Sequence, residues 1–192
     1  MQFEKEITVQ ILDDYNTLHS SLLKEGFKIV DEYILKDIYM LKKEVDINSA
    51  PILDLLNEGI LIRDVVDITK LIVYKYKEFN ETGEITKQSK TKCKIYDIDE
   101  AVNLFNIVGY KELIQINDKC ISYSNDEVEL VVQLVNDKYI FIEMEEKSEF
   151  TNQDFKTEKE MIKALENINI NYDKTNYYVK KAELVFQDKY KS

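Results

Sequence analysis

The chain has 192 residues, 44% of them apolar, and its 26 basic residues against 37 acidic ones give a net charge of −11. So acidic a chain argues against a nucleic-acid partner, because such binding depends on neutralising phosphates. Apolar residues recur too often for disorder, and no uncharged stretch reaches the about 20 residues that span a bilayer. We therefore expect a single domain over residues 1–192, cytoplasmic and without a membrane segment.

The first half of the chain predicts a strand, a helix and then mostly strands. Residues 2–11 alternate between apolar and polar side chains, which is typical of a strand with one buried face. A helix over about 14–25 follows, and Gly26 ends it. Next come a strand over 27–41 and a short helical turn at 53–57. The following strands are predicted over 59–66, 70–79 and 85–96, with a turn at 80–83.

The second half repeats this arrangement. A helix over 98–108 ends at Gly109, as the first helix ends at Gly26, and a strand and a hairpin follow in each half. Antiparallel strands in two such halves can close into a barrel with helices packed outside. The remaining predicted elements are strands near 111–123, 127–135 and 139–145, a helix over 157–167, and a helical or extended stretch through 177–186.

Two pairs of glutamates lie on the polar faces of the first and last strands, Glu4 with Glu6 and Glu143 with Glu145. Residues two apart on a strand point the same way, about 7 Å from each other. Such pairs suit Mg²⁺ or Mn²⁺, which prefer oxygen ligands together with substrate phosphate. In a chain this acidic, pairs of this spacing also arise by chance. We interpret two others as solvated, Glu127/Glu129 and Glu158/Glu160.

The order of short motifs along the chain is more informative than either pair alone. The segments are Glu4-Lys-Glu6-Ile-Thr8, Gly26-Phe27, Asp37-Ile-Tyr39, Leu61-Ile-Arg63, Ile72-Val-Tyr-Lys75, Ile95-Tyr-Asp97, Gly109-Tyr110 and Phe141-Ile-Glu143-Met-Glu145. In this order and spacing the chain resembles the CYTH family, also called triphosphate tunnel metalloenzymes. That family includes class IV adenylate cyclases and thiamine or inorganic triphosphatases.

The resemblance implies an α+β fold: a closed or nearly closed antiparallel β-barrel with helices outside and a polar lumen. It implies that Glu4, Glu6, Glu143 and Glu145 hold Mg²⁺ or Mn²⁺. Arg63 and Lys75 are the phosphate-binding residues it carries over, and no catalytic residue is assigned. The implied partner is a small-molecule triphosphate, namely ATP, thiamine triphosphate or tripolyphosphate, bound by a monomer or homodimer.

The chain also departs from the family pattern. Thr8 and Leu61 replace a lysine and an arginine, and Gln133 stands where a metal-binding aspartate is usual. A basic pair of the family falls on Asp118 and Cys120. The R-x-E-x-E segment falls on Ser89, Thr91 and Cys93, whereas a slip of one residue would bring in Lys90, Lys92 or Lys119.

These observations leave three functions open. The first is a metal-dependent enzyme that hydrolyses a triphosphate or forms cyclic AMP from ATP. The second is a catalytically degenerate barrel that binds a phosphorylated or other small ligand without turnover. The third is an interaction protein that uses its acidic surface toward a basic partner. The retained glutamates favour the enzyme.

Overall fold

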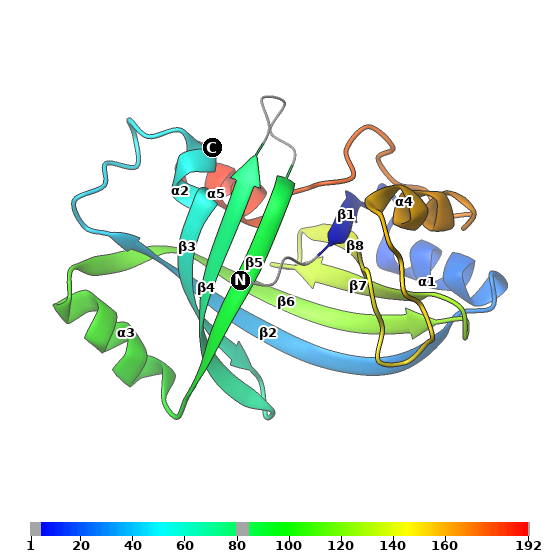
Figure 1. The fold of residues 1–192 in the computed structure, drawn as a ribbon, viewed down its shortest axis with the longest axis horizontal. Helices are drawn as coiled ribbons and strands as arrows, with labels where there is room; N and C mark the ends of the chain where they lie inside the picture. Colours follow the sequence, from blue (N-terminus) through cyan, green and yellow to red (C-terminus); the bar gives the residue numbers. More distant parts are fainter. Residues whose placement is uncertain (1–4, 80–84, 192) are drawn as a thin grey trace. The chain divides into compact units, whose positions relative to one another are not determined.

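The computed structural model describes residues 5–79 and 85–191 (Figure 1). Its strands are hydrogen-bonded in the order β1-β8-β7-β6-β2-β3-β4-β5, and every pair whose register is defined is antiparallel. The predicted α+β class with an antiparallel sheet is confirmed. The turn predicted at 80–83 lies outside the described residues.

The helices and strands follow the predicted order along the chain. The strands are β1 (Glu6–Gln10), β2 (Lys28–Lys42), β3 (Glu58–Val65), β4 (Thr69–Phe79), β5 (Ile85–Ile95), β6 (Tyr110–Ser124), β7 (Glu129–Val135) and β8 (Tyr139–Glu145). The helices are α1 (Tyr15–Lys24), α2 (Ile52–Asn57), α3 (Ile98–Ile107), α4 (Glu158–Glu166) and α5 (Lys181–Tyr190).

The chain divides into two compact units, and β2 and β6 contribute residues to both. Unit 1 contains Ile34–Asn117 and Lys180–Ser192, and unit 2 contains Glu4–Tyr33 and Asp118–Val179. The prediction of a single domain over 1–192 stays a prediction.

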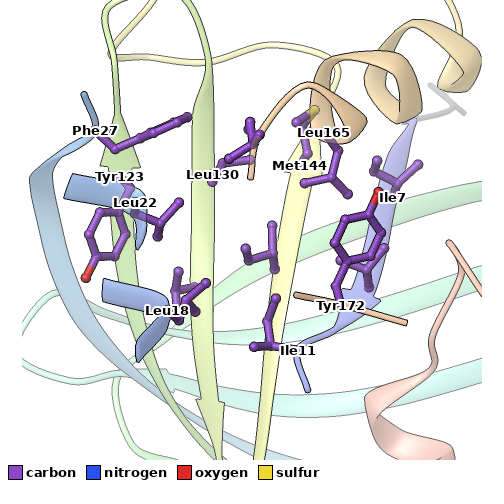
Figure 2. Close-up of a cluster of buried hydrophobic side chains, with 14 of the residues drawn as sticks. Ile7, Ile11, Leu18, Leu22, Phe27, Tyr123, Leu130, Met144, Leu165 and Tyr172 are labelled. Atoms are coloured by element: carbon purple, nitrogen blue, oxygen red, sulfur yellow. The ribbon is translucent and has the colours of Figure 1, made fainter. Parts of the chain in front are cut away.

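In unit 2 one face of the sheet is apolar and is covered by helices α1 and α4. Ile7 of β1, Leu130 of β7 and Met144 of β8 are at most 1% exposed, and they pack with Leu22 of α1 and Leu165 of α4 (Figure 2). Successive side chains of a strand point to opposite faces. The neighbours of these core residues, including Glu6, Glu143 and Glu145, therefore lie on the other face of the sheet.

Unit 1 has the same division between its two faces. Met40 of β2 and Ile62 of β3 pack against Ala101 of α3. Their immediate neighbours on the strands point the other way, so Arg63 of β3 lies on the opposite face from α3, as does its cross-strand partner Asp37 of β2.

The ambiguous segment near the C-terminus resolves into two parts. Tyr177 and Val179 flank a strand-like bridge to β1: the amide of Thr8 donates to Tyr177 and the amide of Val179 donates to Thr8. Helix α5 then begins at Lys181. Backbone pairing with β1 decides the extended conformation, and this partner cannot be read from the local sequence.

Gly26 ends α1 in the left-handed region, at φ +85°, where a side chain is strained. Gly26→Ala is therefore expected to lower the free energy of unfolding by about 1 kcal/mol. Gly59→Ala is the control, because an added Cβ meets nothing within 4 Å at either position and Gly59 has no positive φ. Urea denaturation of both variants measures the difference, and equal stabilities would contradict the assignment of strain to Gly26.

Candidate functional site

Three of the predicted glutamates come together on the polar face of unit 2. Glu6 of β1 lies directly opposite Glu145 of β8, and Glu143 lies opposite Thr8. One carboxylate oxygen of each of Glu6, Glu143 and Glu145 lies within 4.8 Å of the others. We call these three residues the acidic group. Glu4 lies outside the described residues, so its metal-binding role stays a prediction.

The acidic group has the donor chemistry that Mg²⁺ and Mn²⁺ require. Its ligand atoms are carboxylate oxygens, and such ions bind one or two carboxylates while keeping waters or substrate phosphate in other positions. Glu6 and Glu143 are half-buried, and Glu145 is exposed. Three negative charges so close repel one another, and a divalent cation would offset this repulsion. The residues present therefore fit the metal that the resemblance implies.

Gln133 of β7 adjoins this group and contacts one of its members. Its Nε2 atom donates a hydrogen bond to Glu143 Oε2 at 3.2 Å. Gln133 is 3% exposed and Thr8 is 6% exposed, so both positions that depart from the family pattern here are buried beside the carboxylates. Both side chains are neutral: Gln133 stands where the family usually has an aspartate, and Thr8 stands where it has a lysine.

In unit 1 Arg63 forms a two-pronged ion pair with Asp37. Arg63 Nε donates to Asp37 Oδ1 at 2.7 Å, and Nη2 donates to Oδ2 at 2.6 Å. Burial alone would raise the pKa of Asp37, but the hydrogen bonds and charge of Arg63 outweigh it and hold that pKa below its usual range. At least two of the five guanidinium N–H groups thus donate within the protein. The phosphate-binding role of Arg63 stays a prediction.

Lys75 of β4 lies beside this ion pair. Its Nζ donates to Tyr39 Oη at 3.5 Å and lies 5.7 Å from the centroid of the Tyr39 ring. Burial, together with the positive charges of Arg63, Lys90 and Lys181, lowers the pKa of Lys75 to about 8, although Asp37 acts in the opposite direction. The structure thus brings both predicted phosphate-binding residues, Arg63 and Lys75, into one electrostatic group.

The strand register places a further base, Lys90, which the sequence offered only through a one-residue slip of the motif. Lys90 of β5 lies directly opposite Lys75, so both side chains lie on the same face of the sheet, and Lys92 lies opposite Val73. The placement of the R-x-E-x-E motif on Ser89, Thr91 and Cys93 puts that motif on the other face. The one-residue slip that brings in Lys90 and Lys92 agrees with the register.

Lys181 is a further base with no signal in the sequence. It is the first residue of α5, more than a hundred residues from Lys75, and only folding brings it near β4. We call Arg63, Lys75, Lys90 and Lys181 the basic group. Their mutual repulsion disfavours this clustering, and the charge of Asp37 acts in the opposite direction. A bound polyanion would offset the repulsion further.

Because the pKa of Lys75 is about 8, the charge of the basic group depends on pH in the weakly alkaline range. Lys75 is protonated below pH 8 and loses its charge above it, so affinity for an anionic ligand is expected to fall about tenfold from pH 7 to pH 9. Calorimetric titration with tripolyphosphate in Mg²⁺ measures this change. Lys75→Arg, which stays charged throughout, controls for ionisation of the ligand, and an equal fall in both proteins would contradict the assignment.

No protein-family model matches the sequence. A protein named "Putative adenylate cyclase" from Methanocaldococcus jannaschii is 27% identical over 170 residues, which cover 88% of this chain and 91% of that protein.

Solved structures show the same fold. A conserved hypothetical protein from Pyrococcus furiosus has a TM-score of 0.68 at 18% identity, covering 95% of this chain and 99% of the other. A protein from Vibrio parahaemolyticus described as a "putative adenylate cyclase" has a TM-score of 0.64 at 9% identity, covering 97% and 98%. At these identities the likeness concerns the fold alone.

Among the described residues, no helix is both long and apolar enough to cross a membrane. The sequence relative and the shared fold agree with the order of motifs along the chain. The chain is thus similar in sequence to one protein named a putative adenylate cyclase, and it shares its fold with another, as the resemblance to the CYTH family predicts.

Proposed function

We propose that this chain is a divalent-metal-dependent enzyme that acts on a small-molecule triphosphate. The observation that carries the proposal is the acidic group. In it two adjacent strands bring together three carboxylates, with one oxygen of each within 4.8 Å of the others. In unit 2 the acidic group would hold Mg²⁺ or Mn²⁺, and in unit 1 the basic group would supply positive charge that favours an anionic ligand. The metal would neutralise charge on the phosphates and position them.

The chemistry of phosphoryl transfer suits this division of roles. Attack on a phosphorus depends on positioning and on stabilising charge, and needs little covalent participation from the protein. Lysines supply point charges and arginine supplies a planar fork, and both bind phosphate strongly. The name of the M. jannaschii relative supports a nucleoside triphosphate, and cyclic AMP formation from ATP, as one version of the reaction. Hydrolysis of thiamine triphosphate or tripolyphosphate is the other version.

A second candidate is a barrel that binds a phosphorylated ligand without turnover. Two contacts favour it. Asp37 already occupies two of the Arg63 donors, and Gln133 supplies a neutral amide where an acid would add a metal ligand. In both contacts, groups that could bind a ligand or a metal instead interact with other side chains of the protein.

Parallel assays separate these functions. The purified protein is incubated with ATP, thiamine triphosphate or tripolyphosphate, with Mg²⁺, Mn²⁺ or EDTA, and both phosphate release and cyclic AMP are measured. The enzyme proposal expects metal-dependent product from at least one substrate. Binding without product would favour the second candidate, and neither binding nor product would contradict both.

A further inference from the structure

We propose that Gln133 is a positioning residue for a divalent cation: it fixes the Glu143 carboxylate and limits the negative charge of the acidic group. This inference rests on the proposed metal binding. It concerns a residue at which the chain departs from the family pattern, and it predicts that the departure tunes the site instead of destroying it.

The strand register explains how Gln133 reaches Glu143. Val131 of β7, not Gln133, lies directly opposite Glu143, so Gln133 is its diagonal neighbour two residues along β7. Diagonal neighbours on one face of a sheet are about 7–8 Å apart at the backbone, within reach of long side chains. The Gln133 side chain spans this gap and its Nε2 donates to Glu143 Oε2 at 3.2 Å.

Buried neighbours restrict the Gln133 side chain. Cys120 of β6 lies opposite Gln133 on one side and Phe141 of β8 lies opposite it on the other, and both are fully buried. A confined amide loses little further freedom when it holds a carboxylate, so its hydrogen bond orients Glu143 efficiently.

The hydrogen bond is compatible with metal binding at the same carboxylate. A carboxylate oxygen has two lone pairs, so Glu143 Oε2 can accept from the amide and still face a cation. Partners of this kind commonly change metal affinity by 10–100-fold when they are removed. A carboxylate at position 133 would instead add a further negative charge next to Glu143. The two carboxylates would repel each other in the absence of metal, and together they would attract a cation more strongly.

Two substitutions test the two parts of this role. Gln133→Met keeps the length of the side chain and removes the donor, and Gln133→Glu adds the charge. Free Mn²⁺ is measured by electron paramagnetic resonance during titration of each protein, and melting temperature is measured in EDTA and in excess Mn²⁺. Gln115 supplies matched controls because it is exposed and its Nε2 donates to Glu112 Oε2 at 2.9 Å in unit 1.

Gln133→Met is expected to lower Mn²⁺ affinity about tenfold or more, whereas Gln115→Met leaves it unchanged. Gln133→Glu is expected to melt at a lower temperature than the wild type in EDTA. Its melting temperature is expected to rise more than that of the wild type when Mn²⁺ is added. Gln115→Glu should show neither effect.

The outcomes separate this inference from the proposed function. If the wild type binds Mn²⁺ and both Gln133 variants bind it with wild-type affinity and the same melting response, the role of Gln133 is wrong and the metal site stands. If no protein binds Mn²⁺, both are wrong. If Mn²⁺ binding depends on Gln133 but no triphosphate is bound, the inference stands and the proposed substrate class is wrong.

Discussion

Replacing Glu143 and Glu145 together by glutamine is expected to abolish Mn²⁺-dependent triphosphate binding while leaving the protein folded. The change removes two of the three carboxylates that converge within 4.8 Å and leaves Glu6 as the remaining member of the acidic group. Amide oxygens are weaker ligands for these cations than carboxylates, so the ion and the phosphate contacts it mediates are lost together. Calorimetric titration with tripolyphosphate in Mn²⁺ and in EDTA measures the loss.

The fold should survive because removing two like charges from a crowded group relieves repulsion. Glu127→Gln with Glu129→Gln is the control, since it makes the same change in charge at the same spacing in unit 2. Metal-dependent binding that persists in the Glu143/Glu145 double variant would show that the metal is held elsewhere. Loss of binding in the control as well would indicate a general effect of charge.

Asp37→Asn is expected to destabilise the protein by about 3 kcal/mol, because it leaves the charge of Arg63 without its ionic partner in a mostly buried position. The Asp37 side chain is 8% exposed and that of Arg63 is 20% exposed, so solvent screens this pair weakly. Asp31→Asn, an exposed change on the same strand, is the control. Guanidinium denaturation of both variants measures the difference.

Asp37→Asn is also expected to change how the stability of the protein depends on pH. Because the pKa of Asp37 is lowered in the folded protein, its ion pair stabilises the fold above the unfolded pKa of about 4. That stabilisation is lost as the pH falls through the folded value. Asp37→Asn should therefore lose less stability than the wild type as the pH is lowered from about 4. Parallel acid-unfolding curves would contradict the role given to the pair.

Much of the fold could be predicted because its signals are local. Asp14, which accepts hydrogen bonds from the amides of Asn16 and Thr17, and Gly26, with its positive φ, mark the two ends of α1. The hairpin between β7 and β8 turns at Asn136-Asp137, both of which have positive φ, between the strands predicted over 127–135 and 139–145. Alternation of apolar residues fixed which face of each strand is buried.

The candidate sites were less predictable because they depend on pairing between distant residues. On β5 the family's R-x-E-x-E motif can be placed in either of two positions one residue apart, and the sequence alone does not distinguish them. Only the register that sets Lys90 opposite Lys75 shows which lysines share a face with it. The two-pronged contact of Arg63 with Asp37 and the approach of Lys181 to Lys75 also join residues far apart in the chain.

The central claim is that the protein binds a triphosphate through a divalent metal, and a thermal-shift titration tests it most directly. Melting temperature is measured with tripolyphosphate, ATP and thiamine triphosphate, each in Mn²⁺ and in EDTA. A ligand at a hundredfold excess over its Kd stabilises the folded state by about 2.7 kcal/mol, which raises the melting temperature measurably. We expect a clear rise with at least one of these ligands in Mn²⁺ and little or none in EDTA. An unchanged melting temperature with every ligand in Mn²⁺ would contradict the account.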